Sequence, residues 1–167
     1  LDSDVCSSDL KRGEMVADFC AGAGGKTLAI GAMMRSTGRL YAFDTSAHRL
    51  DGLKPRLARS GLSNVQTAAI TNERDDRVKR LAQKMDRVLV DAPCSGTGTI
   101  RRNPDLKWRL KESELADLTA LQTRILASAA QMVKPGGRLV YATCSLLSLE
   151  NEAIANAFTA AHADFEV

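Results

Sequence analysis

The chain has 167 residues, of which 44% are hydrophobic and 26% charged, and its formal net charge is +3. This length suits one domain with a buried core, and the composition excludes a disordered chain, a collagen-like repeat and a disulfide scaffold. No apolar run approaches the roughly 18 residues of a membrane-spanning helix, so we expect a cytoplasmic protein without a membrane partner.

The first ten residues do not fit the pattern of the rest. Residues 3–10 read SDVCSSDL, which lacks apolar periodicity and equals the translation of the end of a widely used sequencing-library adapter. We therefore expect residues 1–10 to be a non-native segment in which Cys6 carries no function. A genuine disordered tail is the alternative. The domain then spans residues 11–167.

Strands and helices alternate along the remainder of the chain. Strands are predicted at residues 15–19, 40–43, 65–70, 87–90 and 138–142. Helices are predicted at 27–35, from after Asp44 to about Ser60, at 75–83, 112–132 and 149–161. Pro55 predicts a kink, Gly61 ends that helix, and the run 134–137 ends the long helix before it. This alternation predicts an α/β fold with a mostly parallel sheet and right-handed crossovers.

Chemically distinctive residues follow four of the predicted strands. They are residues 20–26, Asp44, residues 91–98 and residues 143–145. Ligands of such sheets bind at the carboxyl ends of the strands. The sequence therefore predicts a functional site at this edge.

The glycine-rich segment 20–27 allows three interpretations. A P-loop fits Gly25-Lys26-Thr27, but Cys20 stands where its first glycine belongs. A dinucleotide-binding fingerprint lacks its third glycine, because Thr27 occupies that position. The third interpretation is a loop whose glycines let the backbone approach a nucleoside. Asp44 lies near the offset at which an acidic side chain binds ribose hydroxyls, or it caps the next helix.

An acid and two thiols form a second group. Asp91 and Cys94 lie three residues apart on a Pro- and Gly-containing loop, and Cys144 follows the next strand. Adjacent strand ends can bring these side chains into one pocket; the alternative is a tight turn around a buried cysteine. No C-x-x-C pair occurs, so we expect no metal site. His48 and His162 fall on predicted helices, which disfavours a Cys–His hydrolase.

The segment 101–108 reads RRNPDLKW and is strongly basic. It follows the Asp91 loop, so it could steer a phosphate backbone toward the site, or it could be solvated surface. Fifteen of the 23 basic residues of the chain are arginine, the side chain best suited to bidentate phosphate contacts. Trp108 is predicted to be a packing anchor.

Four segments resemble RNA (cytosine-5)-methyltransferases of the RsmB/Nop/Sun type. They are DFCAGAGGKT (18–27), AFDTSAHRL (42–50), DRVLVDAPCSGTGTIRRNPDLKW (86–108) and KPGGRLVYATCSLLSLENE (134–152). The paired PCS and TCS cysteines make the resemblance specific, and it covers nearly all of residues 11–166. It implies a Rossmann-like class I methyltransferase fold, here truncated before its last strands and incomplete at both ends.

The resemblance also implies an activity and residue roles. The activity is methyl transfer from S-adenosylmethionine to C5 of a cytosine in RNA, with rRNA favoured over tRNA. Cys144 would add to cytosine C6, Cys94 would assist product release, Asp91 would bind the N3/N4 edge, and Lys26 would activate a thiol. The implied cofactor pocket contains Cys20, Ala21, Gly22, Ala23, Gly24, Gly25, Lys26, Asp44, Arg49 and Asp91, with Asn72 or Glu73 in place of the family's acidic residue after strand three.

Two other functions compete with this one. The chain could be a non-catalytic fragment that binds S-adenosylmethionine or RNA, or a P-loop-like nucleotide-binding protein. Titration with S-adenosylmethionine and with ATP tests the P-loop alternative, and bisulfite sequencing of candidate RNAs after incubation with protein and cofactor tests for a non-catalytic fragment. We expect a monomer that needs no metal.

Overall fold

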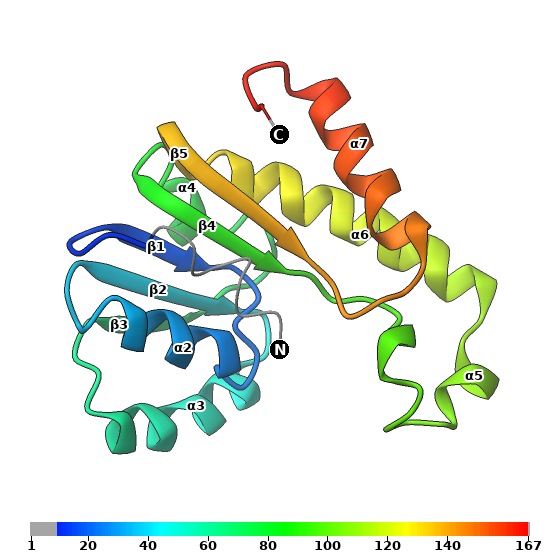
Figure 1. Ribbon diagram of the computed structural model, residues 1–167, viewed down its shortest axis with the longest axis horizontal. Helices are drawn as coiled ribbons and strands as arrows, with labels where there is room; N and C mark the ends of the chain where they lie inside the picture. The colour runs from blue at the N-terminus through cyan, green and yellow to red at the C-terminus, as the bar shows by residue number, and fades with distance from the viewer. Residues whose placement is uncertain (1–9, 167) are drawn as a thin grey trace. The chain divides into compact units, whose positions relative to one another are not determined.

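A five-stranded sheet organises the computed structural model, which describes residues 10–166 (Figure 1). Cys6 and the proposed adapter-derived segment up to residue 9 lie outside the described residues. The strand order is β3-β2-β1-β4-β5, and β1 pairs in parallel with both β2 and β4. The predicted α/β fold with a mostly parallel sheet is confirmed. The strands are β1 (Met15–Asp18), β2 (Arg39–Asp44), β3 (Val65–Ala69), β4 (Met85–Asp91) and β5 (Val133–Ala142).

Helices connect these strands in the predicted order. They are α2 (Gly25–Met33), α3 (Ala47–Ser60), α4 (Asp76–Lys79), α5 (Leu106–Arg109), α6 (Glu112–Ala130) and α7 (Glu152–Ala161), with short 3-10 helices η1 (Thr97–Thr99) and η2 (Ser148–Glu150). Within residues 10–166, none of these helices is both long and apolar enough to cross a bilayer.

The chain forms two compact units. Unit 1 contains the described residues up to Asp91 together with Ser128–Val140, and unit 2 contains Ala92–Ala127 and the described residues from Tyr141 onward. The glycine-rich loop therefore belongs to unit 1, and both cysteine loops belong to unit 2.

Several predicted boundaries are wrong for local reasons. The run 134–137 does not end a helix but lies inside β5. Gly136 has a φ of 73° there, and a Cβ on Gly137 would lie 2.9 Å from the Asp86 carbonyl oxygen, so the glycines let the strand bend and approach β4 closely. Helix α4 covers only four residues, and Gln83, with a φ of 55°, cannot continue a helix.

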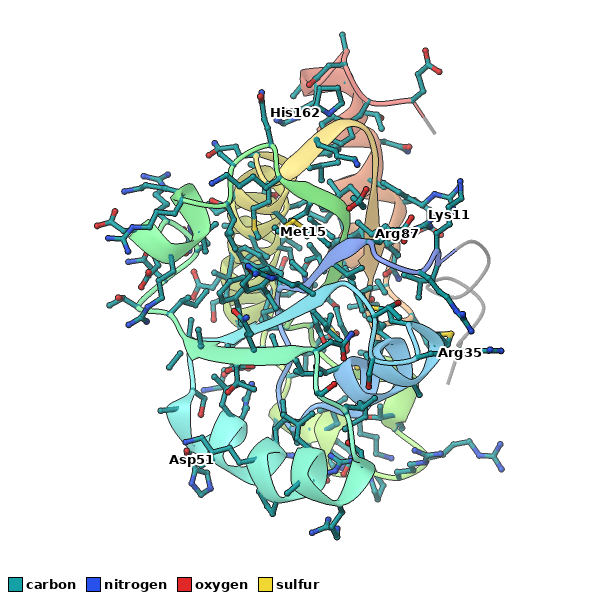
Figure 2. The ribbon with its side chains drawn as sticks, turned by 90° about the vertical axis from the view of Figure 1, so that its left-hand side faces the viewer. Lys11, Met15, Arg35, Asp51, Arg87 and His162 are labelled. Atoms are coloured by element: carbon teal, nitrogen blue, oxygen red, sulfur yellow. The ribbon has the colours of Figure 1, made fainter. Side chains whose placement is uncertain are left out.

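Helix α3 ends where the sequence predicts. It runs through Pro55 to Ser60, and Gly61 adopts the left-handed conformation with a φ of 70°, the usual residue after a helix end. Its outward face is polar: Asp51 extends from α3 into solvent, as Arg35 does after α2 (Figure 2).

The core of unit 1 lies between the sheet and helices α2 and α3. Ile30 and Met34 pack with Val16 and Leu40 of the central strands, and Leu53 of α3 packs with Ala42. Residues two apart on a strand share a face, so Leu40 and Ala42 place both helices on the same side of the sheet. Figure 1 shows α2 and α3 together below the strands.

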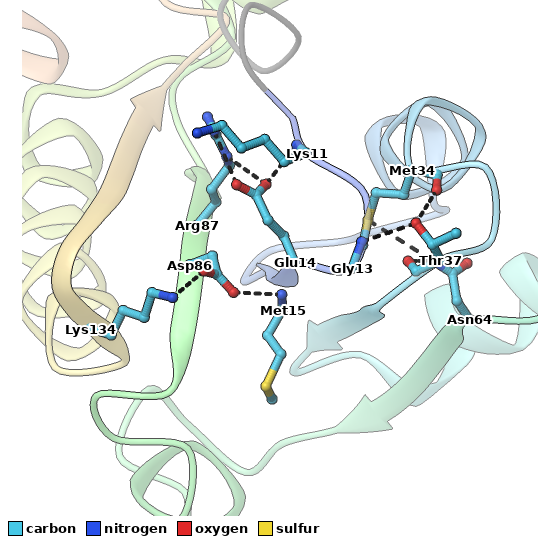
Figure 3. Close-up of polar contacts among 10 residues, drawn as sticks. All are labelled: Lys11, Gly13, Glu14, Met15, Met34, Thr37, Asn64, Asp86, Arg87 and Lys134. Carbon is cyan, nitrogen blue, oxygen red and sulfur yellow. Dashed lines mark hydrogen bonds and ion pairs between the residues drawn. The ribbon is translucent and has the colours of Figure 1, made fainter.

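Charged side chains fix the amino ends of β1 and β4 (Figure 3). Arg87 donates to both carboxylate oxygens of Glu14, at 2.8 and 3.2 Å. Asp86 accepts the Met15 N–H at 2.8 Å and pairs with Lys134. These contacts join β1, β4 and β5 at the end of the sheet opposite the carboxyl ends of β1 and β4, which lead to the glycine-rich loop and to Asp91.

Candidate active site

The glycine-rich loop of unit 1 connects β1 to α2. Backbone hydrogen bonds of 2.8 Å run from Phe19 N to Leu89 O and from Ala21 N to Phe43 O, so the loop is tied to β4 on one side and β2 on the other. Gly24 has a φ of 86°, and a Cβ there would lie 2.1 Å from Leu53 Cδ1. Only glycine fits at this position.

Asp44 holds the same loop from the end of β2. Its Oδ2 accepts the Gly22 N–H at 2.8 Å, and its Oδ1 accepts the Ser46 N–H at 2.7 Å. Ser46 is the residue that caps α3, because its hydroxyl accepts the Arg49 N–H. The helix-capping alternative for Asp44 is therefore wrong. Each of its oxygens keeps a lone pair for a further donor.

Lys26 and Asp91 form an ion pair within unit 1. Lys26 Nζ lies 2.5 Å from Asp91 Oδ2, and both side chains are about one-third exposed. A P-loop lysine extends toward nucleotide phosphates, whereas this lysine binds the carboxylate at the end of β4. The contact favours the methyltransferase interpretation of the loop over the P-loop.

Asp18 is a buried acid that the sequence interpretation missed. Thr27 Oγ1 donates to its Oδ2 at 2.6 Å, and its Oδ1 has no hydrogen-bond partner. Burial raises the pKa of Asp18 to about 6, against the opposing effect of the Thr27 hydrogen bond. An aspartate that ends an apolar strand directly before a glycine-rich loop was the available signal.

Cys20 follows Asp18 and is unsuited to nucleophilic chemistry. Burial raises the pKa of the Cys20 thiol to about 12, and the charges of Asp18, Asp44 and Asp91 add to the effect. Because the thiolate is the nucleophilic form, Cys20 remains an inert thiol at neutral pH. The charges of the carboxylates at the ends of β1, β2 and β4 thus all act on the Cys20 thiol.

The other residues of the predicted cofactor pocket differ in exposure. Arg49 lies on the exposed side of α3, where its charge acts on Cys20 and opposes the rise in that thiol's pKa. Asn72 is exposed in the turn before α4, and its side-chain oxygen accepts the Arg74 N–H at 2.8 Å. Ala21 and Gly24 are buried, whereas Ala23 and Gly25 are exposed.

Unit 2 brings the two cysteine loops together. Cys94 Sγ and Cys144 Sγ lie 3.3 Å apart. Gly98 N donates to Cys144 O at 2.9 Å, and a Cβ on Gly98 would lie 2.6 Å from that oxygen. A glycine is therefore required for the close approach of the loops.

The two thiols have unequal surroundings. Cys144 is exposed. Burial raises the pKa of the Cys94 thiol to about 11, and its hydrogen bond with the Cys144 sulfur adds to the effect, while backbone N–H groups of Gly96 and Cys144 oppose it. At neutral pH Cys94 is protonated, and Cys144 is the thiol that a large substrate can reach.

Two further residues of unit 2 differ from expectation. Trp108 is 80% exposed, so its predicted packing role is wrong; the four-residue helix α5 that carries it has no buried residue. Lys107 Nζ lies 4.9 Å from the centre of the Trp108 ring. Glu150, which the sequence did not single out, is fully buried between the cysteine loops and accepts hydrogen bonds from Ser95. Of the two histidines, His48 of unit 1 is exposed, whereas His162 is half-buried and stacks on Phe158.

Comparison with known families decides among these interpretations. The family described as 16S rRNA methyltransferase RsmB/F matches residues 6–167. The chain belongs to the RsmB/F family.

Individual RsmB/F relatives and solved structures agree. Ribosomal RNA small subunit methyltransferase B of Klebsiella pneumoniae is 39% identical over 160 residues, which cover 94% of this chain and 36% of that protein. The crystal structure of PH0851 has a TM-score of 0.89 and 38% identity, over 96% of this chain and 37% of that one. NSun6 from Pyrococcus horikoshii, solved with SFG, has a TM-score of 0.85 and 28% identity, over 96% and 41%.

The comparisons agree on the type of fold and show how much of each relative the chain covers. The structural neighbours are Rossmann-like methyltransferases, and the RsmB/F family depends on S-adenosylmethionine. The chain spans about a third of the length of the curated relatives it matches. Among residues 10–166, no cluster of three or more His, Cys, Asp or Glu side chains could hold a metal ion.

Proposed function

We propose that this chain transfers a methyl group from S-adenosylmethionine to C5 of a cytosine in RNA. The observation that carries the proposal is the thiol pair of unit 2, with the sulfurs of Cys94 and Cys144 3.3 Å apart and only Cys144 exposed. Cytosine C5 becomes nucleophilic only after a thiolate adds to C6. A second, protonated thiol beside the first fits a reaction in which that bond must later break.

The residues of unit 1 fit an adenosyl cofactor. A Cβ on Gly22 or Gly25 would meet nothing within 4 Å, so the backbone of the loop is open to a ligand. Asp44 retains acceptor capacity for hydroxyl groups, and Asp18 Oδ1 is a buried acceptor without a partner. When bound, the cofactor supplies an electrophilic methyl group. The residues that would hold it are Cys20, Ala21, Gly22, Ala23, Gly24, Gly25, Lys26, Asp44, Arg49, Asn72 and Asp91.

Bond formation would begin at Cys144. Its thiolate adds to C6 of the cytosine, and the electron pair of the C5–C6 double bond moves to C5, which takes the methyl group. Asp91 would bind the N3/N4 edge of the base and stabilise the developing charge. Lys26 donates to Asp91 Oδ2, which holds that carboxylate in place and leaves Oδ1 for the base.

Product release would reverse the first bond. The C5 proton leaves to solvent, its electron pair restores the C5–C6 double bond, and the C6–S bond breaks with its electrons on Cys144. Cys94 is protonated at neutral pH because burial raises the pKa of its thiol to about 11. Its S–H can therefore hydrogen-bond to the departing thiolate across 3.3 Å.

We propose small-subunit rRNA, rather than tRNA, as the RNA. The support is that the curated relatives carry the name ribosomal RNA small subunit methyltransferase B. The basic segment 101–109 and the exposed Trp108 supply charge and an aromatic face for RNA contact. The target base has to leave its stack to reach the thiols.

Methylation followed base by base tests the proposal. The chain is incubated with S-adenosylmethionine and 16S rRNA transcripts, and bisulfite sequencing locates 5-methylcytosine. Cys144→Ala should abolish methylation, whereas Cys94→Ala should accumulate a covalent protein–RNA adduct on denaturing gels. An adduct with Cys144→Ala instead would exchange the two roles. Binding of the cofactor without any methyl transfer would identify a non-catalytic fragment.

A further inference from the structure

A buried carboxylate connects the two cysteine loops of unit 2. Glu150 is 0% exposed. Its Oε1 accepts the Ser95 N–H at 2.8 Å and the Gln122 side-chain N–H at 3.0 Å, and its Oε2 accepts the Ser95 hydroxyl. Gln122 also donates to Pro93 O at 2.9 Å. Glu150 therefore fixes both residues that flank Cys94.

Hydroxyl groups extend this contact to the second loop. Ser145 Oγ lies 3.2 Å from Ser95 Oγ and 3.0 Å from Thr97 Oγ1. Thr97 Oγ1 accepts the Leu146 N–H at 2.8 Å, and Ser145 Oγ accepts the Leu147 N–H at 3.1 Å. The backbone directly after Cys144 is thus held by the same network.

The direction of every hydrogen bond in the network follows from the carboxylate. Burial alone would raise the pKa of Glu150, but hydrogen bonds from Ser145, Ser95 and Gln122 outweigh it and hold the pKa below its ordinary value. An ionised carboxylate only accepts, so Ser95 gives its single hydroxyl proton to Glu150. Ser145 then donates toward Ser95 and the carboxylate, and Thr97 donates to Ser145. The hydroxyl protons of Ser95, Ser145 and Thr97 thus all have an acceptor.

We propose that Glu150 is a positioning residue that sets the separation and relative orientation of Cys94 and Cys144 through Ser95 and Ser145. The residue touches neither thiol, and it acts through the two serines that follow them in the chain. The consequence for methyl transfer rests on the function proposed above. The effect on the geometry of the two thiols does not depend on that function.

Glu150→Gln is the decisive substitution, because it keeps the volume and reverses one hydrogen bond. The glutamine oxygen can still accept from Ser95 N and Gln122, but the amide nitrogen would face the Ser95 hydroxyl as a donor. Ser95 would then donate to Ser145 and Ser145 to Thr97. The Thr97 proton would lose its acceptor, and a buried unpaired donor makes the arrangement unfavourable. The loops should therefore separate or rotate.

Thiol–disulfide exchange measures this geometry without any catalysis. Two thiols and one oxidised glutathione give the Cys94–Cys144 disulfide and two reduced glutathiones, so electrons and protons balance. The sulfurs lie 3.3 Å apart and need to approach by only about 1.25 Å to reach the roughly 2.05 Å of a disulfide bond, so the effective concentration of the pair in the parent chain should be high. We expect Glu150→Gln to lower that effective concentration at least tenfold, and Ser95→Ala to lower it less.

Two comparisons separate positioning from loss of stability. Ile154→Val shortens a buried side chain of α7 that forms no part of the network, so it should loosen unit 2 without changing the effective concentration. In the methylation assay, Glu150→Gln should reduce kcat at least tenfold and change the KM for S-adenosylmethionine less than twofold.

The outcomes distinguish this proposal from the proposed function. An unchanged effective concentration in Glu150→Gln, or an equal loss in Ile154→Val, would overturn the positioning role. A parent chain that forms the disulfide readily but methylates no cytosine would overturn the function alone. A normal kcat in a Glu150→Gln variant with impaired exchange would show that thiol geometry does not limit turnover, and the positioning role in catalysis would fail.

Discussion

The buried carboxyl of Asp18 should make stability depend on pH in an unusual direction. Burial at the end of β1 raises its pKa from 3.8 to about 6. Between those values the folded protein binds a proton that the unfolded chain has released, so the stability from this group is complete below pH 4 and is lost as the pH rises through 6. One pKa unit corresponds to about 1.36 kcal/mol. The ionised Asp18 therefore costs the folded state about 3 kcal/mol at pH 7.5.

Asp18→Asn removes this cost while it retains an oxygen that can accept from Thr27. The free energy of unfolding of the variant, minus that of the parent, should rise by about 2.4 kcal/mol between pH 4 and pH 7.5. Most of the rise should fall between pH 4 and 6.5. Urea unfolding followed by circular dichroism at four pH values measures it, and the subtraction cancels every group that titrates in both proteins.

A surface aspartate supplies the matched control. Asp51 extends from α3 into solvent (Figure 2), and its hydrogen bond from Lys54 holds its pKa below the ordinary value. The free energy of unfolding of Asp51→Asn, minus that of the parent, should therefore not change with pH above pH 4.5. A flat or falling difference for Asp18→Asn would refute the burial argument, because it would mean that the folded state accommodates the ionised carboxylate without cost.

Three further predictions concern the glycine-rich loop, the end of β2 and the basic segment. Gly24→Ala should reduce the free energy of unfolding by about 2 kcal/mol or more, because its φ of 86° strains any other residue and a Cβ would lie 2.1 Å from Leu53 Cδ1. Gly52→Ala in α3, where a Cβ meets nothing, should be neutral or stabilising. Equal losses of stability in the two variants would contradict the explanation from strain and clash. Asp44→Ala should weaken S-adenosylmethionine binding at least tenfold in calorimetric titration, because it removes a charged hydrogen-bond acceptor worth about 1.5–3 kcal/mol. If the parent chain instead bound ATP tightly and hydrolysed it, the P-loop interpretation would be restored. Trp108 is the only tryptophan, so single-stranded RNA should quench the intrinsic fluorescence whereas heparin, a polyanion without bases, should not. Quenching by both, or by neither, would exclude base stacking on Trp108.

The position of the acidic residues of unit 1 could be predicted because strand order constrains it. Asp44 and Asp91 each end a strand, and parallel strands bring such positions to one edge. The hydrogen bond from the Gly22 N–H to Asp44 was not predicted. The boundaries of some helices and strands were predicted wrongly. The run 134–137 reads as a helix stop from composition, yet contact with β4 makes it strand.

The two misjudged side chains failed for opposite reasons. Tryptophan is highly buried on average and glutamate is almost never fully buried unless paired, so Trp108 was expected inside and Glu150 drew no attention. Tertiary context reverses both. Helix α5 is too short to bury a face, and Glu150 finds enough donors in Ser95 and Gln122 to remain ionised away from water. No periodicity in a single sequence reports how many donors will surround a carboxylate.

The unequal burial of the cysteines explains how one residue type can serve two steps of a reaction. A nucleophile has to reach its substrate, and among the three described cysteines only Cys144 is exposed. A group that assists the departure of that nucleophile has to keep its proton at neutral pH, and burial gives the Cys94 thiol a pKa of about 11. Exchange of the two environments would turn the thiol with the raised pKa toward the substrate. The two proposed roles therefore match the surroundings that each loop provides.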